Sequence, residues 1–254
     1  MENILKLIRF DARVQIATIL FLISLYAFFI GDFNQESINI LIGILSAVIL
    51  DGLILRYWKK RWVFPYSAIV TGFLIGLILN PDFAAWQFVF VAFLAISSKY
   101  LLLPLQRHIF NPAALGLVVA SIFFNGAITW WGVSWVTNLW VFLFIAAGLV
   151  LWRLHRIWLP IGFLLIYWAY FAVQGSLSLT LISDPTITLF ALIMLPEPQT
   201  SPIVGHFRYS YGAFVAVLVI LISVLFSTVK TDPLLVSLLL ANIAGFALRK
   251  FKFI

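Results

Sequence analysis

The sequence contains no cysteine and very little charge. Without a thiol, the chain itself can form no disulfide, no thiolate zinc site and no Cys-ligated iron–sulfur cluster. Only 10% of its 254 residues are charged, whereas soluble domains carry about 25%, so a soluble globular protein is excluded. The sequence also lacks a nucleotide-binding loop, a catalytic triad and a metal-spacing motif. It therefore offers no catalytic or metal-ligating residues, and any redox chemistry must be brought by a cofactor.

Apolar residues are what the chain has in excess. Hydrophobic residues make up 64% of it, and the mean hydropathy is +1.12, which indicates a multi-pass membrane protein. About ten helices of about 20 residues would fill the chain. This leaves no room for a soluble domain, so we expect residues 1–254 to form a single all-α membrane domain. The net charge of +7 comes from basic residues that flank apolar runs, which gives no reason to expect nucleic-acid binding.

Basic residues indicate the orientation in the membrane. Lys6, Arg9 and Arg13 precede the first apolar run, which lacks a convincing cleavage site and is expected to be a retained span. A second cluster, from Arg56 to Arg61, follows the second run. Because cytoplasmic loops are enriched in Lys and Arg, both clusters are expected in the cytoplasm. With ten spans, both termini are cytoplasmic.

Two short helices bounded by proline are predicted. One begins after Pro65 and ends before Asn80-Pro81, and the other begins at Pro185 and ends before Pro196. At 1.5 Å per residue, both fall short of the roughly 30 Å hydrocarbon core. They are expected to be broken helices, although prolines can also simply mark ordinary helix ends.

The two short helices occupy matching places in the chain. Each is the third span of a five-span half, with the first repeat over about 1–125 and the second over about 138–254. Asn111-Pro112 and Asp232-Pro233 open the fifth span of each half. An odd number of spans makes the repeats inverted, and paired broken helices in inverted halves indicate a site near the bilayer midplane.

Asn111-Pro112 is the clearest helix start in the sequence. An Asn side chain can accept hydrogen bonds from the unpaired amides of a first helical turn, and proline suits that turn because it lacks an N–H group. Within hydrocarbon, such a polar helix end is tolerated only where it is buried in protein or faces water or a ligand. Asn111 is therefore a candidate binding residue.

Charged and hydroxyl side chains near the short helices complete the candidate site. Asp51 in the second span is an ion-coupling candidate, or else a carboxylate paired with Arg56 or a neighbouring helix, because an unpaired charge there is costly. Lys99 ends the fourth span and either binds an anionic group or extends to the interface. The candidate cofactor-binding residues are Ser67, Thr71, Lys99, Asn111, Glu197, Thr200 and Ser201.

Several of these motifs together resemble a known family. Tyr66 to Gly72, Phe110-Asn111-Pro112-Ala113 with the preceding Lys99, and Glu197 to Pro202 resemble segments of the B subunit of the sodium-translocating NADH:quinone reductase and of the D subunit of the Rnf complex. Asp51 also matches. The likeness runs in the same order along nearly the whole chain.

The resemblance implies a ten-helix bundle of two inverted five-helix repeats, similar to urea channels. It implies an electron-carrying, flavin-containing subunit of a bacterial inner-membrane oxidoreductase complex that couples electron transfer to cation movement. Its partners would be other membrane and soluble electron-transport subunits or a flavoprotein reductase, with quinone as a further candidate.

One feature departs from that family. Its members usually carry FMN covalently on a threonine of a small-residue motif in the loop after the fifth span. Here that loop, residues 125–137, contains Thr129 and Thr137 without the Gly-Ala-Thr pattern. We therefore expect FMN or riboflavin to be bound non-covalently.

Two other functions use the same features. One is a channel or facilitator for a small polar solute, which would use the same pocket without redox chemistry. The other is a structural anchor for a soluble flavoprotein, given the basic cytoplasmic face.

Overall fold

In the computed structural model, the described residues are 11–30, 35–60, 63–102, 107–134, 138–202, 206–226 and 231–250. Lys6, Arg9, Arg61 and Thr137, named above, lie outside them. Within the described ranges the protein is helical, and its only β pairing is one isolated antiparallel bridge between Leu79 and Ile128. The predicted all-α fold is confirmed.

In the first half of the chain, the described residues form five main helices. They are α2 (Ala12–Ile30), α3 (Gln35–Leu53), α4 (Tyr66–Ile78), α5 (Ala85–Leu101) and α6 (Pro112–Phe123), and α3 continues into a π-helical turn, η1 (Ile54–Trp58). A short helix, α7 (Trp131–Ser134), follows α6.

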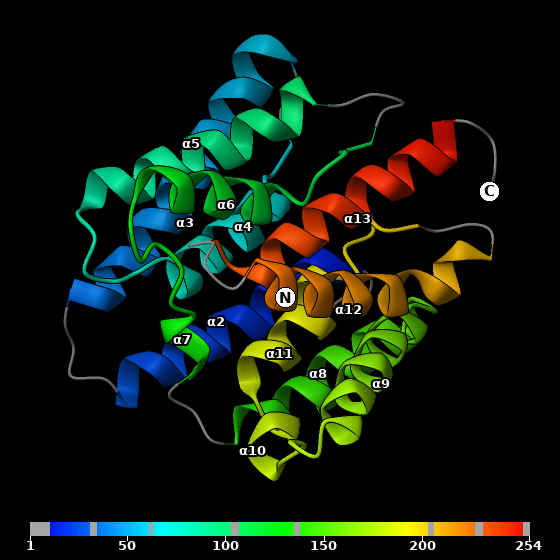
Figure 1. The fold of residues 1–254 in the computed structure, drawn as a ribbon. Helices are drawn as coiled ribbons and strands as arrows, with labels where there is room; N and C mark the ends of the chain where they lie inside the picture. The colour runs from blue at the N-terminus through cyan, green and yellow to red at the C-terminus, as the bar shows by residue number, and fades with distance from the viewer. Residues whose placement is uncertain are drawn as a thin grey trace.

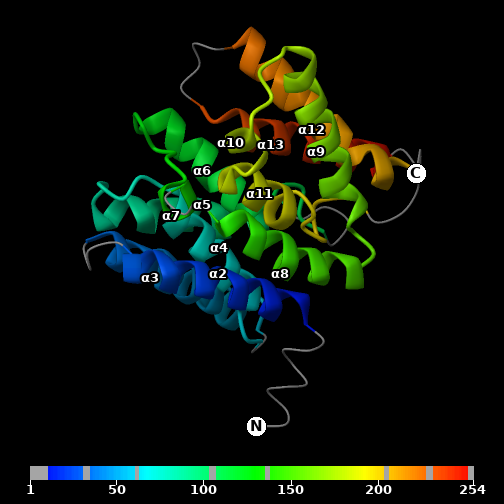
Figure 2. The ribbon, with the colours of Figure 1, turned by 90° about the horizontal axis from the view of Figure 1, so that it is seen from below.

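The second half has a similar order of elements. It consists of α8 (Leu139–Arg153), α9 (Trp158–Val173), the short α10 (Leu179–Ile182), α11 (Pro185–Leu189) with its π-helical continuation η3 (Phe190–Met194), α12 (Phe207–Leu225) and α13 (Pro233–Lys250). In Figures 1 and 2 the helices of the first half lie on one side of the molecule and those of the second half on the other.

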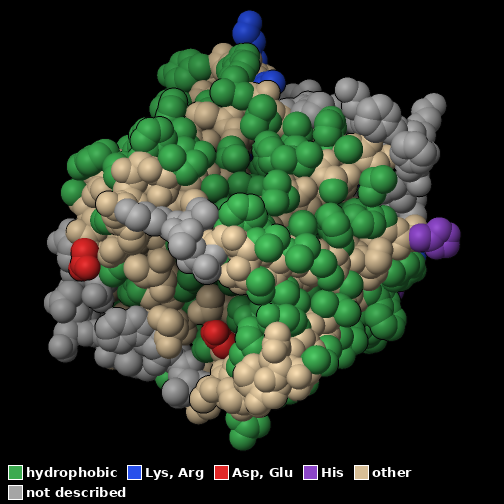
Figure 3. All heavy atoms as spheres, in the orientation of Figure 1, with side chains coloured by type: hydrophobic (Ala, Val, Ile, Leu, Met, Phe, Trp, Pro, Cys, Tyr) green, Lys and Arg blue, Asp and Glu red, His purple; other side chains and the backbone are tan. Residues whose placement is uncertain are grey.

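Three of the described helices are long and apolar enough to cross a membrane, and seven shorter helices are also apolar. Large hydrophobic side chains such as Phe29, Leu149 and Leu225 are exposed on the outside. On the face seen in Figure 3, hydrophobic side chains predominate and charged ones are few. Water would penalise such a surface, whereas lipid chains accept it, so the protein is a multi-pass membrane protein.

The helices of the first half pack closely because small residues lie where they cross. Gly72 and Gly76 of α4 lie against the backbone of α3, so a Cβ atom on Gly76 would come within 2.6 Å of the Cα atom of Ile40. Helix association in membranes depends on such close contacts, since lipid supplies no hydrophobic driving force between helices.

A similar glycine contact joins α9 and α12 in the second half. A Cβ atom on Gly212 would lie 1.9 Å from the carbonyl oxygen of Leu159. The two helices can therefore cross only with glycine at this position.

The two predicted short helices are both present. α4 spans 13 residues, and α11 with η3 spans residues 185–194. Beyond α4, the backbone of Asn80 donates to the carbonyl of Ala127 at 2.8 Å, which closes the helix end onto the loop that follows α6. Beyond η3, the chain turns back through the proline-rich segment 196–202, called the break below.

Candidate functional site

A cavity of about 1000 Å³ lies between the two halves of the molecule. It is lined by α2, α3, α4 and α5, by the start of α6 and by the break. Its volume is at the upper end of the roughly 300–1,000 Å³ that ligand pockets occupy. The sequence-predicted residues that line it are Asp51, Ser67, Thr71, Lys99, Asn111 and Glu197.

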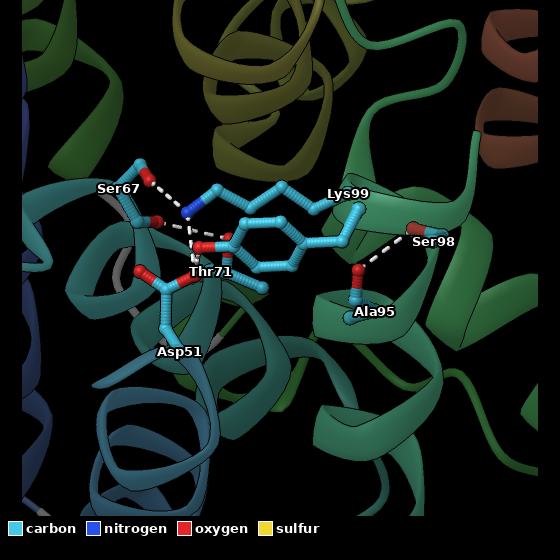
Figure 4. A network of polar contacts seen from close by, with 7 residues as sticks. Asp51, Ser67, Thr71, Ala95, Ser98 and Lys99 are labelled. Atoms are coloured by element: carbon cyan, nitrogen blue, oxygen red, sulfur yellow. Dashed lines mark hydrogen bonds and ion pairs between the residues drawn. The ribbon is translucent and has the colours of Figure 1, made fainter. Parts of the chain in front are cut away.

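A buried network centred on Asp51 forms the polar wall of this cavity (Figure 4). The Lys99 ammonium donates to Asp51 Oδ1 at 2.8 Å and to Ser67 Oγ at 2.6 Å. The Tyr100 hydroxyl donates to the same Oδ1 atom at 2.6 Å. Thus three helices, α3, α4 and α5, meet at one carboxylate, and Asp51 is paired with a neighbouring helix rather than with Arg56.

The Asp51–Lys99 pair is shielded from the surroundings. The side chains of Asp51 and Lys99 are 1% and 11% exposed, respectively. Removing one member of such a buried pair typically costs about 3–5 kcal/mol, because the other charge is left uncompensated. Ionisable side chains buried at such a cost in free energy inside a membrane usually belong to functional sites.

Two polar atoms in the cavity wall have no hydrogen-bond partner among the described residues. They are Asp51 Oδ2 and His108 Nδ1. His108 is hydrogen-bonded to the backbone of Lys99, and its burial, together with the nearby Lys99 charge, lowers its pKa to about 4. At physiological pH the ring is therefore neutral. Because buried polar atoms are nearly always paired in proteins, these two enclosed atoms leave hydrogen-bonding capacity unused within residues that line the cavity.

Ser67 and Thr71 lie one helical turn apart on α4. Thr71 donates its hydroxyl to the carbonyl oxygen of Ser67 at 3.0 Å, a common arrangement for threonine in a helix. The Ser67 hydroxyl accepts from Lys99 instead. Both line the cavity, but Ser67 belongs to the charged network and Thr71 to the helix wall.

Asn111 caps α6 and joins the two halves, which confirms the predicted helix start. Its Oδ1 atom accepts from the backbone of Ala114 at 3.1 Å, and Pro112 follows at the first helical position. Its own backbone N–H donates to Asn242 Oδ1 on α13 at 3.0 Å, and its Nδ2 atom donates to the Met194 carbonyl of η3 at 3.4 Å. Asn111 is 3% exposed. It lines the cavity at the place where α6, α13 and η3 meet.

Two arginines hold the break in place. Arg156, in the turn between α8 and α9, donates to the carbonyl of Pro196 at 3.0 Å, to Ser201 Oγ at 2.5 Å and to the carbonyl of Pro202 at 3.5 Å. Arg107 donates to the carbonyl of Pro198 at 2.5 Å. The guanidinium groups therefore satisfy the carbonyls that the interrupted helix leaves unpaired.

The predicted residues of the break take different positions. Glu197 lines the cavity and accepts from the Thr200 hydroxyl at 3.1 Å. Ser201 donates its hydroxyl to the Glu197 carbonyl at 2.6 Å. Thr200 and Ser201 are 0% exposed and are not among the cavity-lining residues. Their hydroxyls fix the conformation of the break, and Glu197 is the one of these three residues that lines the cavity.

Tyr100, His108 and Arg156 were missed as individual site residues. Tyr100 directly follows Lys99, and successive helical residues point in directions about 100° apart, so sequence alone does not place both at one carboxylate. His108 and Arg156 lie in short polar turns, where polar side chains are usually exposed to solvent. Only their burial, 7% exposure for Arg156, reveals their part in the site.

Comparison with known proteins shows the family. A family profile described as NQR2, RnfD, RnfE matches residues 6–139, more than half of the chain. The chain belongs to this NQR2/RnfD/RnfE family. The matched segment contains Asp51, Ser67, Lys99 and Asn111, whereas Glu197 lies outside it.

Curated relatives in this family resemble part of the chain. The D subunit of the ion-translocating oxidoreductase complex of Buchnera aphidicola is 35% identical over 109 residues, which are 42% of this chain and 31% of the relative. The protein of the same name from Alcanivorax borkumensis is 37% identical over 98 residues, 37% of this chain and 29% of the relative. The match covers less than a third of the length of these two relatives.

A more distant relative has a different name. The D subunit of the proton-translocating ferredoxin:NAD(+) oxidoreductase complex of Clostridium ljungdahlii is 28% identical over 107 residues, 41% of this chain and 32% of the relative. These three relatives are thus all D subunits of ion-translocating or proton-translocating complexes.

Proposed function

We propose that this protein is a membrane subunit of an ion-translocating oxidoreductase complex and carries electrons through a flavin bound in the central cavity. The names of its relatives support the first part. The single observation that carries the second part is the cavity itself, in which a buried Asp51–Lys99 pair faces the ends of two short helices. A bacterial inner-membrane location with both termini in the cytoplasm belongs to this proposal.

Equivalent helix contacts in the two halves support the inverted-repeat architecture. In the first half, α3 packs against α4 and α5, and α5 packs against α6; in the second half, α9 packs against η3 and α12, and α12 packs against α13. The contact of α2 with α4 corresponds to that of α8 with α11. Between the halves, α2 touches its counterpart α8, and α6 touches its counterpart α13, as expected for helices beside a two-fold axis that relates the halves.

We therefore propose ten spans in two inverted five-helix repeats, with α4 and α11–η3 as the paired broken helices. The counterpart of the Asn111 cap is Asp232, whose Oδ1 atom accepts from the backbone of Leu234 at 2.8 Å and of Leu235 at 3.1 Å. Sites in inverted-repeat membrane proteins lie where such broken helices face each other, which is where the cavity is found.

The chemical character of the lining fits a flavin. An isoalloxazine ring has an apolar dimethylbenzene end and a polar pyrimidine end. The cavity offers a matching division, with Leu55, Val70, Leu74 and Ile193 on apolar walls and the Asp51 network on the polar wall. Lys99, whose ammonium group has three N–H donors, can donate to a ring oxygen as well as to Asp51 and Ser67.

Bound there, a flavin would supply one- and two-electron redox chemistry. Lys99 would stabilise negative charge on the reduced ring, and the first turn of α6 at Pro112 would add the positive end of a helix dipole. Glu197, held by Thr200, would hold a ring edge or a coupled cation. The surrounding lipid-facing helices would exclude bulk water from the reaction.

We propose non-covalent attachment. The candidate threonine that the structure describes, Thr129, lies in the extended segment after α6, where its backbone N–H donates to the Ile78 carbonyl at 3.0 Å. It is not among the residues that line the cavity. FMN and riboflavin both remain suitable, and the electron donor and acceptor would be other subunits or a flavoprotein reductase, with quinone as a further acceptor.

The visible spectrum of the purified protein tests this function. We expect flavin absorption near one equivalent per chain and release of the flavin into the supernatant when the protein is denatured with acid. Flavin that stays with the precipitated chain would show covalent attachment. A colourless protein that mediates flux of a small polar solute in proteoliposomes without an electron donor would instead support the channel hypothesis.

A further inference from the structure

Several oxygen atoms that could bind a metal cation in this site are already bound by the protein's own cations. At Asp51, the Lys99 ammonium lies 2.8 Å from Oδ1. It also donates a hydrogen bond to the Ser67 hydroxyl. A sodium ion needs several oxygen ligands to replace its hydration shell. Only Oδ2 of the carboxylate is left without a partner among the described residues.

Several carbonyl groups of the break are also bound by the protein's own cations. Arg156 binds the carbonyls of Pro196 and Pro202, and Arg107 binds that of Pro198. The carbonyl of Glu197 itself accepts from the Ser201 hydroxyl. Nor do the described residues contain a group of three His, Asp or Glu residues suited to a metal ion.

A single free carboxylate oxygen is sufficient for one ion, the proton. Protonation needs no shell of ligands, and it would turn Asp51 into a neutral acid that no longer requires Lys99. A buried carboxylate that loses its cation is neutralised rather than left charged. The network can therefore take two forms, the ion pair or, when another negative charge is present to pair with Lys99, a protonated Asp51.

We propose that Asp51 is a proton-loading site controlled by Lys99, and that the ion coupled at this cavity is a proton. This inference rests on the proposed function in one respect, the arrival of an electron. When an electron from a partner subunit adds one negative charge to the cavity, Lys99 turns toward that charge. Asp51 then takes up one proton from water through Oδ2, so one electron and one proton enter together and the net charge of the cavity is unchanged.

When the electron leaves for the acceptor, the process reverses. Lys99 returns to Asp51, and the carboxyl group releases its proton to water in the cavity. His108 also lines the cavity, and its Nδ1 atom has no partner among the described residues. Transport across the membrane requires that release and uptake occur toward opposite sides.

Other charged and titratable groups also face this cavity, so the test must separate their signals. From the N-terminal segment come Asp11 and Arg13; from the break comes Glu197; from α4 comes Tyr66; from α5 comes Tyr100. Glu197 is the group most easily confused with Asp51, because it is also a carboxylate that feels the charge of Lys99.

Infrared spectroscopy of the protein in lipid nanodiscs tests the proposal, since a protonated carboxyl group has its own C=O stretching band. At pH 7, we expect Lys99→Met to gain one carboxylic acid band over wild type. The band should disappear in Lys99→Met combined with Asp51→Asn and persist in Lys99→Met combined with Glu197→Gln. If Lys99→Met does not fold, Lys99→Gln, which keeps a donor for Ser67, takes its place.

Sodium dependence distinguishes a proton from a metal ion. The band of Lys99→Met should be the same in sodium chloride and in choline chloride at equal ionic strength. Its suppression by sodium alone would show that sodium replaces Lys99 and would overturn the proposal. Absence of a new band, or a band that is lost with Glu197→Gln and kept with Asp51→Asn, would also overturn it.

A second measurement tests the link to electrons. In wild type with its flavin, chemical reduction should raise the same band, and in Asp51→Asn it should not. A reduced wild-type protein without the band would contradict the coupling. A protein without flavin would remove the proposed function, whereas the result with Lys99→Met would still decide whether Asp51 binds the proton.

Discussion

Replacing Arg156 should destabilise the protein more than replacing any exposed arginine. Arg156 is 7% exposed, and its guanidinium group donates to the Pro196 carbonyl, to Ser201 Oγ and to the Pro202 carbonyl. Burial lowers its pKa to about 10, so it remains charged at neutral pH. Arg156→Met keeps most of the apolar stem but removes all three donated hydrogen bonds.

The size of the effect follows from those contacts. A buried acceptor left without a partner costs about 1–3 kcal/mol. Ser201 keeps its bond to the Glu197 carbonyl and the contact to Pro202 is long, so the main loss is at the Pro196 carbonyl, with a smaller loss where Ser201 Oγ accepted from Arg156. We expect a total of about 3 kcal/mol, equivalent to a fall of roughly 6–12 °C in the melting temperature of a chain of this size.

Thermal unfolding of the detergent-solubilised protein measures this loss. The matched control is Arg208→Met, because Arg208 is exposed and mainly lies over the ring of Tyr209. Exposed substitutions usually stay within about 0.5 kcal/mol. A melting temperature of Arg156→Met equal to that of Arg208→Met would refute the role of Arg156 in holding the break.

Three further predictions follow from individual contacts. Gly212→Ala should prevent close packing of α9 on α12, because its Cβ atom would lie 1.9 Å from the Leu159 carbonyl oxygen. The control Gly148→Ala, whose Cβ atom would have nothing within 4 Å, should be neutral or stabilise the protein by up to about 1 kcal/mol. The two variants are compared by chromatographic monodispersity and by melting temperature. As pH falls from about 6.5 to about 4, His108 binds protons in the unfolded chain before it does so in the folded one, so stability should fall by up to about 3 kcal/mol. His108→Gln should flatten this part of the pH profile of urea unfolding, and an unchanged profile would contradict the assignment. Asn111→Ala should cost about 1 kcal/mol for the lost helix cap and more for the contacts to α13 and η3, whereas a loss below about 0.5 kcal/mol would show that the cap contributes little.

Local features of the site could be predicted because they depend on near neighbours in the sequence. Asn111-Pro112 specifies a helix start by its own chemistry, and α6 begins there. Prolines at the start of α11 and at the start of the break limit the helix between them to residues 185–194. The cost of charge in an apolar run indicates that Asp51 must be paired or functional.

The contacts between helices could not be predicted in the same way. The bonds from Lys99 to Asp51 and Ser67 connect residues 48 and 32 positions apart in the chain, and no local pattern fixes which helices become neighbours. The hydroxyls of Thr200 and Ser201 were expected beside the cofactor, but in the turn of the break they donate to the Glu197 carboxylate and to the Glu197 carbonyl, respectively. The π-helical turns that end α3 and α11 have no sequence signal of their own.

The central claim, that the cavity between the two halves holds a redox-active flavin, is tested most directly by a reduced-minus-oxidised visible difference spectrum of two matched variants. Val70→Trp places a large side chain in the cavity wall, whereas Val89→Trp places the same side chain on the exposed side of α5. We predict a flavin signal in wild type and Val89→Trp and its loss in folded Val70→Trp. An equal flavin signal in all three proteins, or none in wild type, would contradict the account.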